Sequence, residues 1–163
     1  MKASATVEVF RPIDEVFEYI ANVENMNQWV VSVGETKRVS GDGTGVGDRY
    51  ESSYTYGGKT HDMNFEVTEY ESPTRFGITA PEGPFAFDGR LELEATERGT
   101  LVTNTIDNEA DGRFTAFMFT VFKPIMRWLM ARRLREELSE LKSVLEGNGS
   151  SVSGPNQAGP SGV

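Results

Sequence analysis

The sequence predicts an α+β fold in which one curved antiparallel sheet of six to seven strands wraps around a long C-terminal helix. Short alternating segments rich in Tyr, Phe, Thr and Val run from Val31 to Asp107 and are separated by Gly and Pro. The segment Gly112–Glu146 then carries apolar residues at helical spacing. Because each strand presents one apolar face, we expect the helix to cover the sheet and to leave a partly hollow core.

The composition describes one soluble, acidic domain. The chain has 163 residues and a formal net charge of −9, a balance that disfavours nucleic acid and anionic membrane surfaces as partners. It contains no cysteine, which excludes disulfides, thiolate nucleophiles and cysteine-based metal sites. No apolar run is long enough to span a membrane and no signal core is evident, so we expect a cytoplasmic location.

A strand and two short helices are expected first. Ala3–Phe10 alternates as a strand does, and Pro12 suits the first position of a helix that ends near Asn22. Val23–Trp29 predicts a second short helical turn. The buried stripe of the first helix is expected to consist of Ile13, Val16, Phe17 and Ile20.

Six further strands follow in the alternating region. Gly57 and Gly58 supply the positive φ angles of a tight hairpin, and consecutive hairpins with short turns predict an antiparallel meander. The expected strands are Val31–Val39, Asp48–Tyr56, His61–Tyr70, Arg75–Ala80, Phe85–Thr96 and Leu101–Asp107.

Pro124 interrupts the long helix. It removes one helical hydrogen bond and costs about 3 kcal/mol in a helix interior. The helix either begins near this proline or bends there, and a bend could simply follow the sheet or act as a hinge that makes Phe114–Phe122 a gate. The basic cluster Arg127, Arg132, Arg133 and Arg135 precedes several glutamates and predicts a solvated helix face with local ion pairs.

Gly, Ser, Pro and Asn dominate from Gly147 to Val163. Such a segment buries too little apolar surface to offset its ordering entropy. We therefore expect a folded domain over residues 1–146 and a disordered, dispensable tail over 147–163.

Several stretches of the chain resemble the START-like superfamily, also called the polyketide cyclase/dehydrase or SRPBCC group. They are VEVFRPIDEVFEYIANVENMNQW, GVGDRYESSY, FEVTEYESPTRF, ATERGTLVTNT and FKPIMRWLMARRLREELSELKSVLEG. The resemblance covers Ala3–Gly147 and implies a helix-grip fold with a cavity between sheet and helix. Members include lipid carriers, hormone and flavonoid-type binders and polyketide cyclases, so the fold leaves the activity open.

Alternation along the strands and helix indicates which side chains face the predicted cavity. Such a lining is apolar with a few polar groups, as ligand pockets are, although an ordinary solid core would use the same residues. The candidate ligand-binding residues are Tyr50, Tyr54, Phe65, Phe76, Phe87, Asn104, Phe114, Phe117, Met118 and Val121.

Few residues suggest acid–base or metal chemistry, and no catalytic residue is assigned. His61 is the only histidine and could act as a general base, but its place after a hairpin favours the sheet rim. Asp88 and Arg90 are expected to form an outward ion pair. Ser52 and Asn64 are conceivable polar groups of a cyclase pocket. No metal motif is present, and we expect neither metal nor cofactor.

These observations favour binding of a small hydrophobic or aromatic ligand in an internal cavity, for transport or sequestration. A polyketide cyclase/dehydratase-like enzyme is the first alternative, and a co-chaperone-type protein-interaction module is the second. An apolar patch on the outer sheet face would favour the second alternative. We expect a monomer or weak homodimer, with no nucleic acid partner and no membrane insertion.

Overall fold

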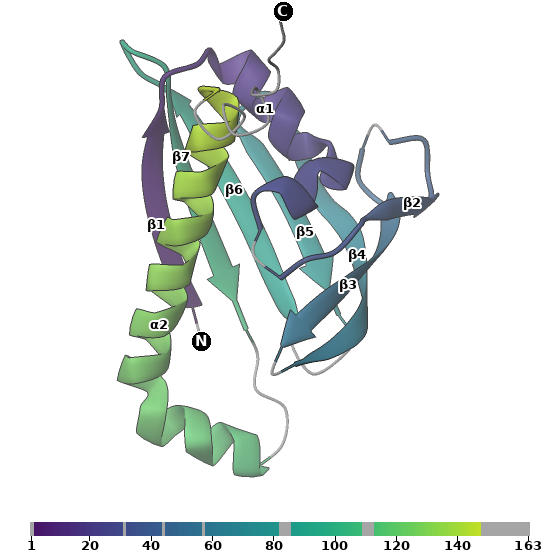
Figure 1. The fold of residues 1–163 in the computed structure, drawn as a ribbon, viewed down its shortest axis with the longest axis vertical. Helices are drawn as coiled ribbons and strands as arrows, with labels where there is room; N and C mark the ends of the chain where they lie inside the picture. Colours follow the sequence, from purple (N-terminus) through teal and green to yellow (C-terminus); the bar gives the residue numbers. More distant parts are fainter. Residues whose placement is uncertain are drawn as a thin grey trace, which may run out of the picture.

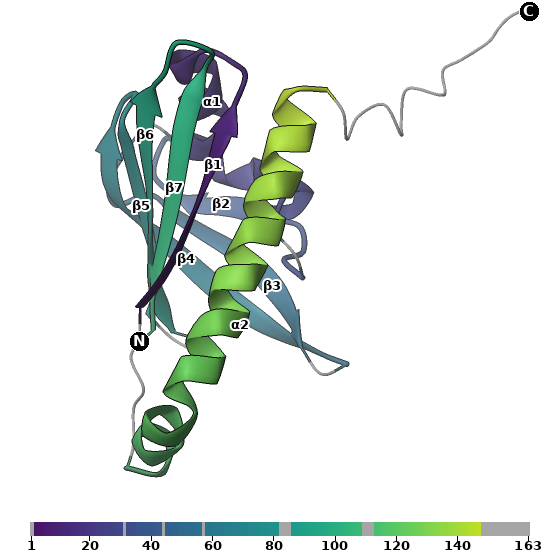
Figure 2. The same cartoon turned by 90° about the vertical axis from the view of Figure 1, so that its left-hand side faces the viewer.

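One antiparallel sheet of seven strands holds a long helix against its concave face (Figures 1 and 2). The computed structural model describes residues 2–30, 32–43, 45–56, 58–81, 86–108 and 113–147, with the backbone alone for 113–123, Met126 and Tyr56. The strands are β1 (Lys2–Val9), β2 (Lys37–Ser40), β3 (Arg49–Tyr56), β4 (Lys59–Glu71), β5 (Arg75–Ala80), β6 (Phe87–Ala95) and β7 (Thr100–Asp107). The helices are α1 (Ile13–Ala21), the short 3₁₀ helix η1 (Val23–Gln28) and α2 (Arg113–Leu145).

The strand order is β1-β7-β6-β5-β4-β3-β2, and all neighbours are antiparallel. Strands β2 to β7 form the predicted meander, and β1 pairs with the last strand, so that Ala5 lies opposite Asn104. Gly58 has a φ of 78°, as the predicted β3–β4 hairpin requires. The helix-grip α+β fold expected from the sequence is confirmed.

A bulge in β4 decides which of its residues face the core. Met63, Phe65 and Val67 are buried in alternation, and the register then shifts between Val67 and Glu69. The shift turns Glu69 outward and Tyr70 inward. Tyr70 therefore packs edge-on against Phe17 of α1, with ring centroids 5.4 Å apart.

The helices cover different parts of the concave face. Helix α1 packs at one end against β5 and β6, while α2 packs mainly against β1 (Figure 1). Leu134, Leu138 and Leu141 are the buried side chains through which the second half of α2 meets the core. The stripe follows from their spacing, which places them on one face of the helix.

Helix α2 is continuous from Arg113 and includes Pro124. Figures 1 and 2 show that its first turns run in a different direction from the remainder. The helix therefore bends rather than beginning at the proline. The helical hydrogen bond that Pro124 cannot make accounts for the bend. Whether the bend also acts as a gate stays a prediction.

The first strand of the meander is shorter than Val31–Val39. Only Lys37–Ser40 forms β2, and Val33 makes an isolated bridge to Tyr54. Ser32 has a φ of 70°, which an extended strand cannot accommodate. Smaller shifts occur elsewhere, since Pro12 is the N-cap of α1 rather than its first residue.

Candidate functional site

The sheet and the long helix are joined across the concave face by Arg133 and Tyr54. Nη1 of Arg133 donates a hydrogen bond to the Tyr54 hydroxyl, and the guanidinium lies 5.2 Å from the centroid of the Tyr54 ring. Helix α2 itself packs on β1, whereas Tyr54 belongs to β3, the sixth strand in the sheet order. The contact therefore links the helix, which packs on β1 at one edge of the sheet, to β3 near the other edge.

A buried carboxylate holds the guanidinium in place. Nε of Arg133 donates to Oε1 of Glu137 over 3.2 Å, and the Glu137 side chain is 7% exposed. Burial lowers the pKa of Arg133, but Tyr54 and Glu137 outweigh it and hold that pKa above its ordinary value. A permanent positive charge thus lies at the edge of an apolar face.

The concave face has a closed half and an open half. In the closed half, side chains of the sheet and helices are fully buried, among them Val9, Phe76, Val102 and Leu138. In the open half, which we define by Tyr54, His61, Phe87, Gly89, Ile106 and Met130, every residue is half-buried. Tyr54, Phe87, Ile106 and Met130 still pack against the core, so the open half is an apolar surface that solvent reaches.

Phe65 and Asn104 form the buried border of the open half. The Phe65 and Phe87 rings meet edge-on with centroids 6.2 Å apart. Asn104 is 5% exposed and lies between Ala5 and Leu91 on the neighbouring strands. A polar group at this border of an apolar surface can fix the orientation of a ligand.

Gly89 allows two apolar side chains of this surface to lie close to the sheet backbone. A Cβ atom there would lie 3.1 Å from Cδ1 of Ile106 and 3.3 Å from Cε2 of Phe87. Both distances are shorter than ordinary contact between carbon atoms. The missing side chain therefore lets Phe87 and Ile106 lie close over the β6 backbone, and a larger residue at this position would displace them.

The predicted ligand-binding residues fall into three groups. Tyr54, Phe87 and Asn104 lie in or beside the open half. Tyr50, Phe65 and Phe76 are buried at 4%, 2% and 2% exposure, and Phe76 belongs to an aromatic cluster with Phe17 and Tyr70. Phe114, Phe117, Met118 and Val121 lie on the described backbone of α2, but their side chains are outside the described part of the structure.

Sequence reasoning missed Arg133 and Glu137. It placed Arg133 in a solvated basic cluster, which is correct for its neighbour Arg132, since that residue forms an exposed ion pair with Glu136 at 3.1 Å. The available signal was the buried leucine spacing. Arg133 and Glu137 immediately precede Leu134 and Leu138, and they are four residues apart, so both border the buried stripe.

The structure also places His61, Asp88 and Arg90, the candidates for acid–base or ion-pair roles. His61 is half-buried and lies opposite Tyr54 across β3 and β4. Arg90 pairs at 2.7 Å with Glu69 rather than with Asp88. Gly77 lies between those two in the sheet register and has no side chain to separate them.

Polar side chains cover the described outer face of the sheet. Arg90–Glu69 and Arg49–Glu66 are exposed ion pairs on it, and Asn64 is also exposed there. This outer face does not provide the apolar patch that would favour a co-chaperone-type module.

Ser52, which the sequence left open as a pocket group, hydrogen-bonds to Thr36 over 2.9 Å and to the Gly34 carbonyl over 3.2 Å.

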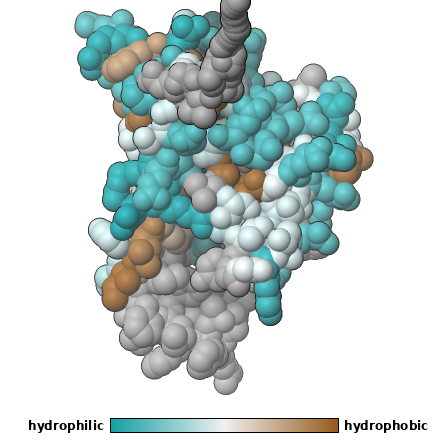
Figure 3. Space-filling model, viewed as in Figure 1, coloured by the Kyte–Doolittle hydropathy of each residue, from teal (hydrophilic) through white to brown (hydrophobic). Residues whose placement is uncertain are grey.

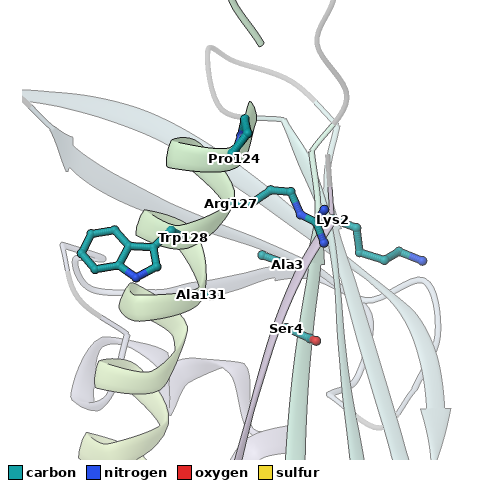
Figure 4. A pocket seen from close by; sticks show the side chains of 7 residues that line it. All are labelled: Lys2, Ala3, Ser4, Pro124, Arg127, Trp128 and Ala131. Carbon is teal, nitrogen blue, oxygen red and sulfur yellow. The ribbon is translucent and has the colours of Figure 1, made fainter. Parts of the chain in front are cut away.

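Two hollows lie elsewhere on the described surface. One, of about 440 Å³, separates β1 from α2 and is lined by Lys2, Ala3, Ser4, Pro124, Arg127, Trp128 and Ala131 (Figure 4). The other, of about 390 Å³, is lined by Thr74, Arg75, Glu92, Leu93, Glu94, Leu101 and Thr103. Neither is lined by the predicted ligand-binding residues, so the predicted cavity stays a prediction.

Comparison with known proteins decides the family. The profile of the family described as polyketide cyclase / dehydrase and lipid transport matches residues 1–146. The chain belongs to this family. A comparison with curated protein sequences finds no match.

Solved structures share the fold of this family member at low sequence identity. TTHA0849 from Thermus thermophilus matches with a TM-score of 0.72 at 18% identity, over 90% of this chain and 98% of that one. SA2116 from Staphylococcus aureus, a protein of unknown function, gives 0.69 at 14% identity, over 92% and 96%. The di-domain ARO/CYC BexL of the BE-7585A biosynthetic pathway gives 0.64 at 14% identity, over 88% and 49%. At these identities the matches support the fold alone.

Within the described ranges, no helix is long and apolar enough to cross a membrane. The same residues include no group of three or more His, Asp or Glu side chains that could hold a metal ion.

Proposed function

We propose that this protein binds a small hydrophobic or aromatic molecule on the open half of the concave face. The observation that carries the proposal is the half-buried apolar surface formed by Tyr54, Phe87, Ile106 and Met130 beneath the Arg133–Tyr54 contact. A soluble protein gains free energy by covering such side chains. Ligand sites of this kind are concave and apolar with a few placed polar groups.

The polar groups suggest how a ligand would lie. The half-buried ring of Phe87, which the buried Phe65 ring meets edge-on, provides a surface for an aromatic body. The guanidinium of Arg133 attracts a carbonyl, phenol or carboxylate oxygen. Asn104 offers an amide at the buried border. We therefore expect an amphipathic ligand with an oxygen-bearing end rather than a pure hydrocarbon.

Fluorescent-probe titration tests this proposal. N-phenyl-1-naphthylamine is neutral and aromatic, and its emission rises in apolar surroundings. In Gly89→Leu, the new side chain would displace Phe87 and Ile106, because a Cβ atom at this position already lies within 3.3 Å of both. Gly45→Leu is the matched control, because a Cβ atom at Gly45 meets nothing within 4 Å.

We expect saturable binding by the wild type and by Gly45→Leu, and an affinity loss of about tenfold or more in Gly89→Leu, since the displaced Phe87 and Ile106 no longer form the apolar surface. Thermal melts identify any variant that is merely unfolded. Absence of saturable binding by the wild type, or equal affinity in a folded Gly89→Leu, would show that the open half is not the site.

A cyclase- or dehydratase-like activity is the second candidate. The observation that favours it is the placement of Arg133 and Tyr54 on the open half, with His61 opposite Tyr54. A fixed cation and a phenol can stabilise the enolate oxygen that forms when a ketone is deprotonated. Mass spectrometry of a poly-β-ketone thioester analogue tests it: Tyr54→Phe should slow cyclisation while retaining probe binding. Equal rates with wild type, Tyr54→Phe and no protein would exclude catalysis of this reaction.

A further inference from the structure

Helix α2 places a carboxylate and a cation together beside the open half of the concave face. Glu137 lies four residues after Arg133, and Nε of Arg133 donates a hydrogen bond to its Oε1 over 3.2 Å. Nη1 of the same guanidinium donates to the hydroxyl of Tyr54 on β3. The three side chains therefore form a row from α2 to the sheet, with Arg133 between the buried carboxylate and the phenol.

Burial distinguishes this ion pair from its neighbour on α2. The side chains of Arg133 and Glu137 are 37% and 7% exposed, whereas those of Arg132 and Glu136 are 58% and 60% exposed. Water therefore screens the Arg132–Glu136 pair well but reaches Glu137 only slightly. The charge of Glu137 consequently acts with little screening on a group that binds next to Arg133.

The surroundings of the buried pair are apolar. The residue after each partner is a buried leucine, Leu134 or Leu138, at 5% and 0% exposure. Met130, one turn before Arg133, packs against the core. Figure 3 shows hydrophobic colour in the middle of this face, beside the hydrophilic colour of α2. Apart from His61, the described side chains of the open half carry no charge near neutral pH.

The charges of Arg133 and Glu137 cancel each other. A guanidinium alone would attract a carboxylate ligand more strongly than a neutral oxygen. Beside this pair, however, a carboxylate ligand meets the carboxylate of Glu137, and like charges close together weaken binding. The ligand carboxylate must also leave water, which costs more free energy than desolvating a carbonyl group. A neutral oxygen avoids both costs and still accepts a hydrogen bond from the guanidinium.

We propose that Glu137 determines the ligand class of this site: the ligand presents a neutral oxygen, as in a ketone, an amide or a phenol, and organic carboxylates are excluded. This inference rests on the proposed function, because it concerns a ligand on the open half of the concave face. Glu137 acts through its charge and through its hydrogen bond to Arg133, without contacting the ligand. It narrows the set of ligands that Arg133 by itself would accept.

Two ligands of the same shape separate charge from fit. 2-Naphthamide and 2-naphthoate share an aromatic body and carry an amide and a carboxylate, so at about pH 7 only the second is charged. Equilibrium dialysis of the full chain against each ligand gives the two dissociation constants. Only binding that Gly89→Leu weakens counts as binding to the open half. We expect the wild type to bind 2-naphthamide at least about tenfold more tightly than 2-naphthoate.

Matched variants assign this preference to Glu137. Glu137→Gln keeps the shape of the side chain but removes the carboxylate beside Arg133, so the preference for 2-naphthamide should fall at least about tenfold. Glu136→Gln makes the same change in net charge at the exposed pair and should leave the preference within about twofold of the wild type. If a thermal melt shows that Glu137→Gln does not fold, Met130→Lys replaces it. That variant adds a cation one turn before Arg133, keeps Glu137, and should also lower the preference.

The outcomes separate this inference from the proposed function. If N-phenyl-1-naphthylamine binds saturably but 2-naphthamide does not bind more tightly than 2-naphthoate, the proposed function stands and the role of Glu137 is wrong. An unchanged preference in a folded Glu137→Gln, or in Met130→Lys where that variant replaces it, would also overturn the role, as would an equal fall in Glu136→Gln. Absence of saturable binding of all three compounds would overturn both proposals.

Discussion

Replacing Glu146 by Gln should weaken the attachment of the end of α2 to the end of β1. Oε2 of Glu146 accepts hydrogen bonds from the backbone amide of Phe10 over 2.8 Å and from Nζ of Lys142 over 2.6 Å. Lys142 also donates to the Glu8 carbonyl over 2.9 Å, and its Nζ lies 3.8 Å from the centroid of the Phe10 ring. One carboxylate thus holds together two parts of the chain that are far apart in sequence.

The expected loss of unfolding free energy is about 1–2 kcal/mol. A hydrogen bond to a charged group contributes about 1.5–3 kcal/mol, and Gln retains one acceptor oxygen. The Glu146 side chain is 13% exposed, so solvent screens it little. Glu136→Gln is the matched control, because Glu136 also pairs four residues away, with Arg132, but both side chains are about 60% exposed. We expect that control to cost less than about 0.5 kcal/mol.

Urea denaturation at several pH values checks both the size and the cause. Burial raises the pKa of Glu146, but the hydrogen bonds from Lys142 and Phe10 outweigh it and hold that pKa below its ordinary value of 4.5. A depressed carboxyl pKa stabilises the fold above the unfolded pKa, and the contribution is lost as the pH falls through the folded pKa. The difference between wild type and Glu146→Gln should therefore be full near neutral pH and vanish in acid. A difference that is the same at both pH values, or no larger than that of Glu136→Gln, would refute the electrostatic account.

Three further predictions concern the tail, the bend and the buried ion pair. Truncation after Gly147, whose φ of 84° and whose amide hydrogen bond to the Val144 carbonyl end the helix, should leave Tm within about 2 °C in a thermal melt. In hydrogen exchange, amides of 113–122 should exchange faster than those after the bend, and Pro124→Ala should slow them; equal protection would leave the gate without support. Arg133→Met should cost about 3 kcal/mol in urea denaturation because it removes a cation from buried Glu137, and the added substitution Glu137→Gln should recover part of that loss.

Much of the fold was predictable because its signals are local. Alternation located β5 at Arg75–Ala80 without error, and the end of α2 falls within one residue of the sequence prediction. The exception is the segment before β2. Its alternation resembles a strand, but Ser32 has a positive φ and β2 pairs on one side only, at the edge of the sheet. Such breaks depend on tertiary contacts that periodicity does not report.

The candidate site was only partly predictable. Strand alternation places Tyr54, Phe87 and Asn104 on the concave face, and it does not depend on how far the helix covers them. Which half of that face stays open depends on where α1 and α2 lie on the sheet. The sequence does not determine these positions. The pairing of Arg133 with Tyr54 likewise joins residues 79 apart in sequence. A local pattern assigns Arg133 only to its nearest carboxylate.

The two halves of α2 differ in composition because their side chains have different surroundings. After Met130, buried leucines face the sheet, and acidic residues balance the basic ones. Just before it, the described side chains of Ile125, Arg127, Trp128 and Leu129 are exposed. Met130 belongs to the open half of the concave face and Arg133 borders it, so the change from exposed to buried apolar residues along α2 falls beside the surface where we propose that the ligand binds.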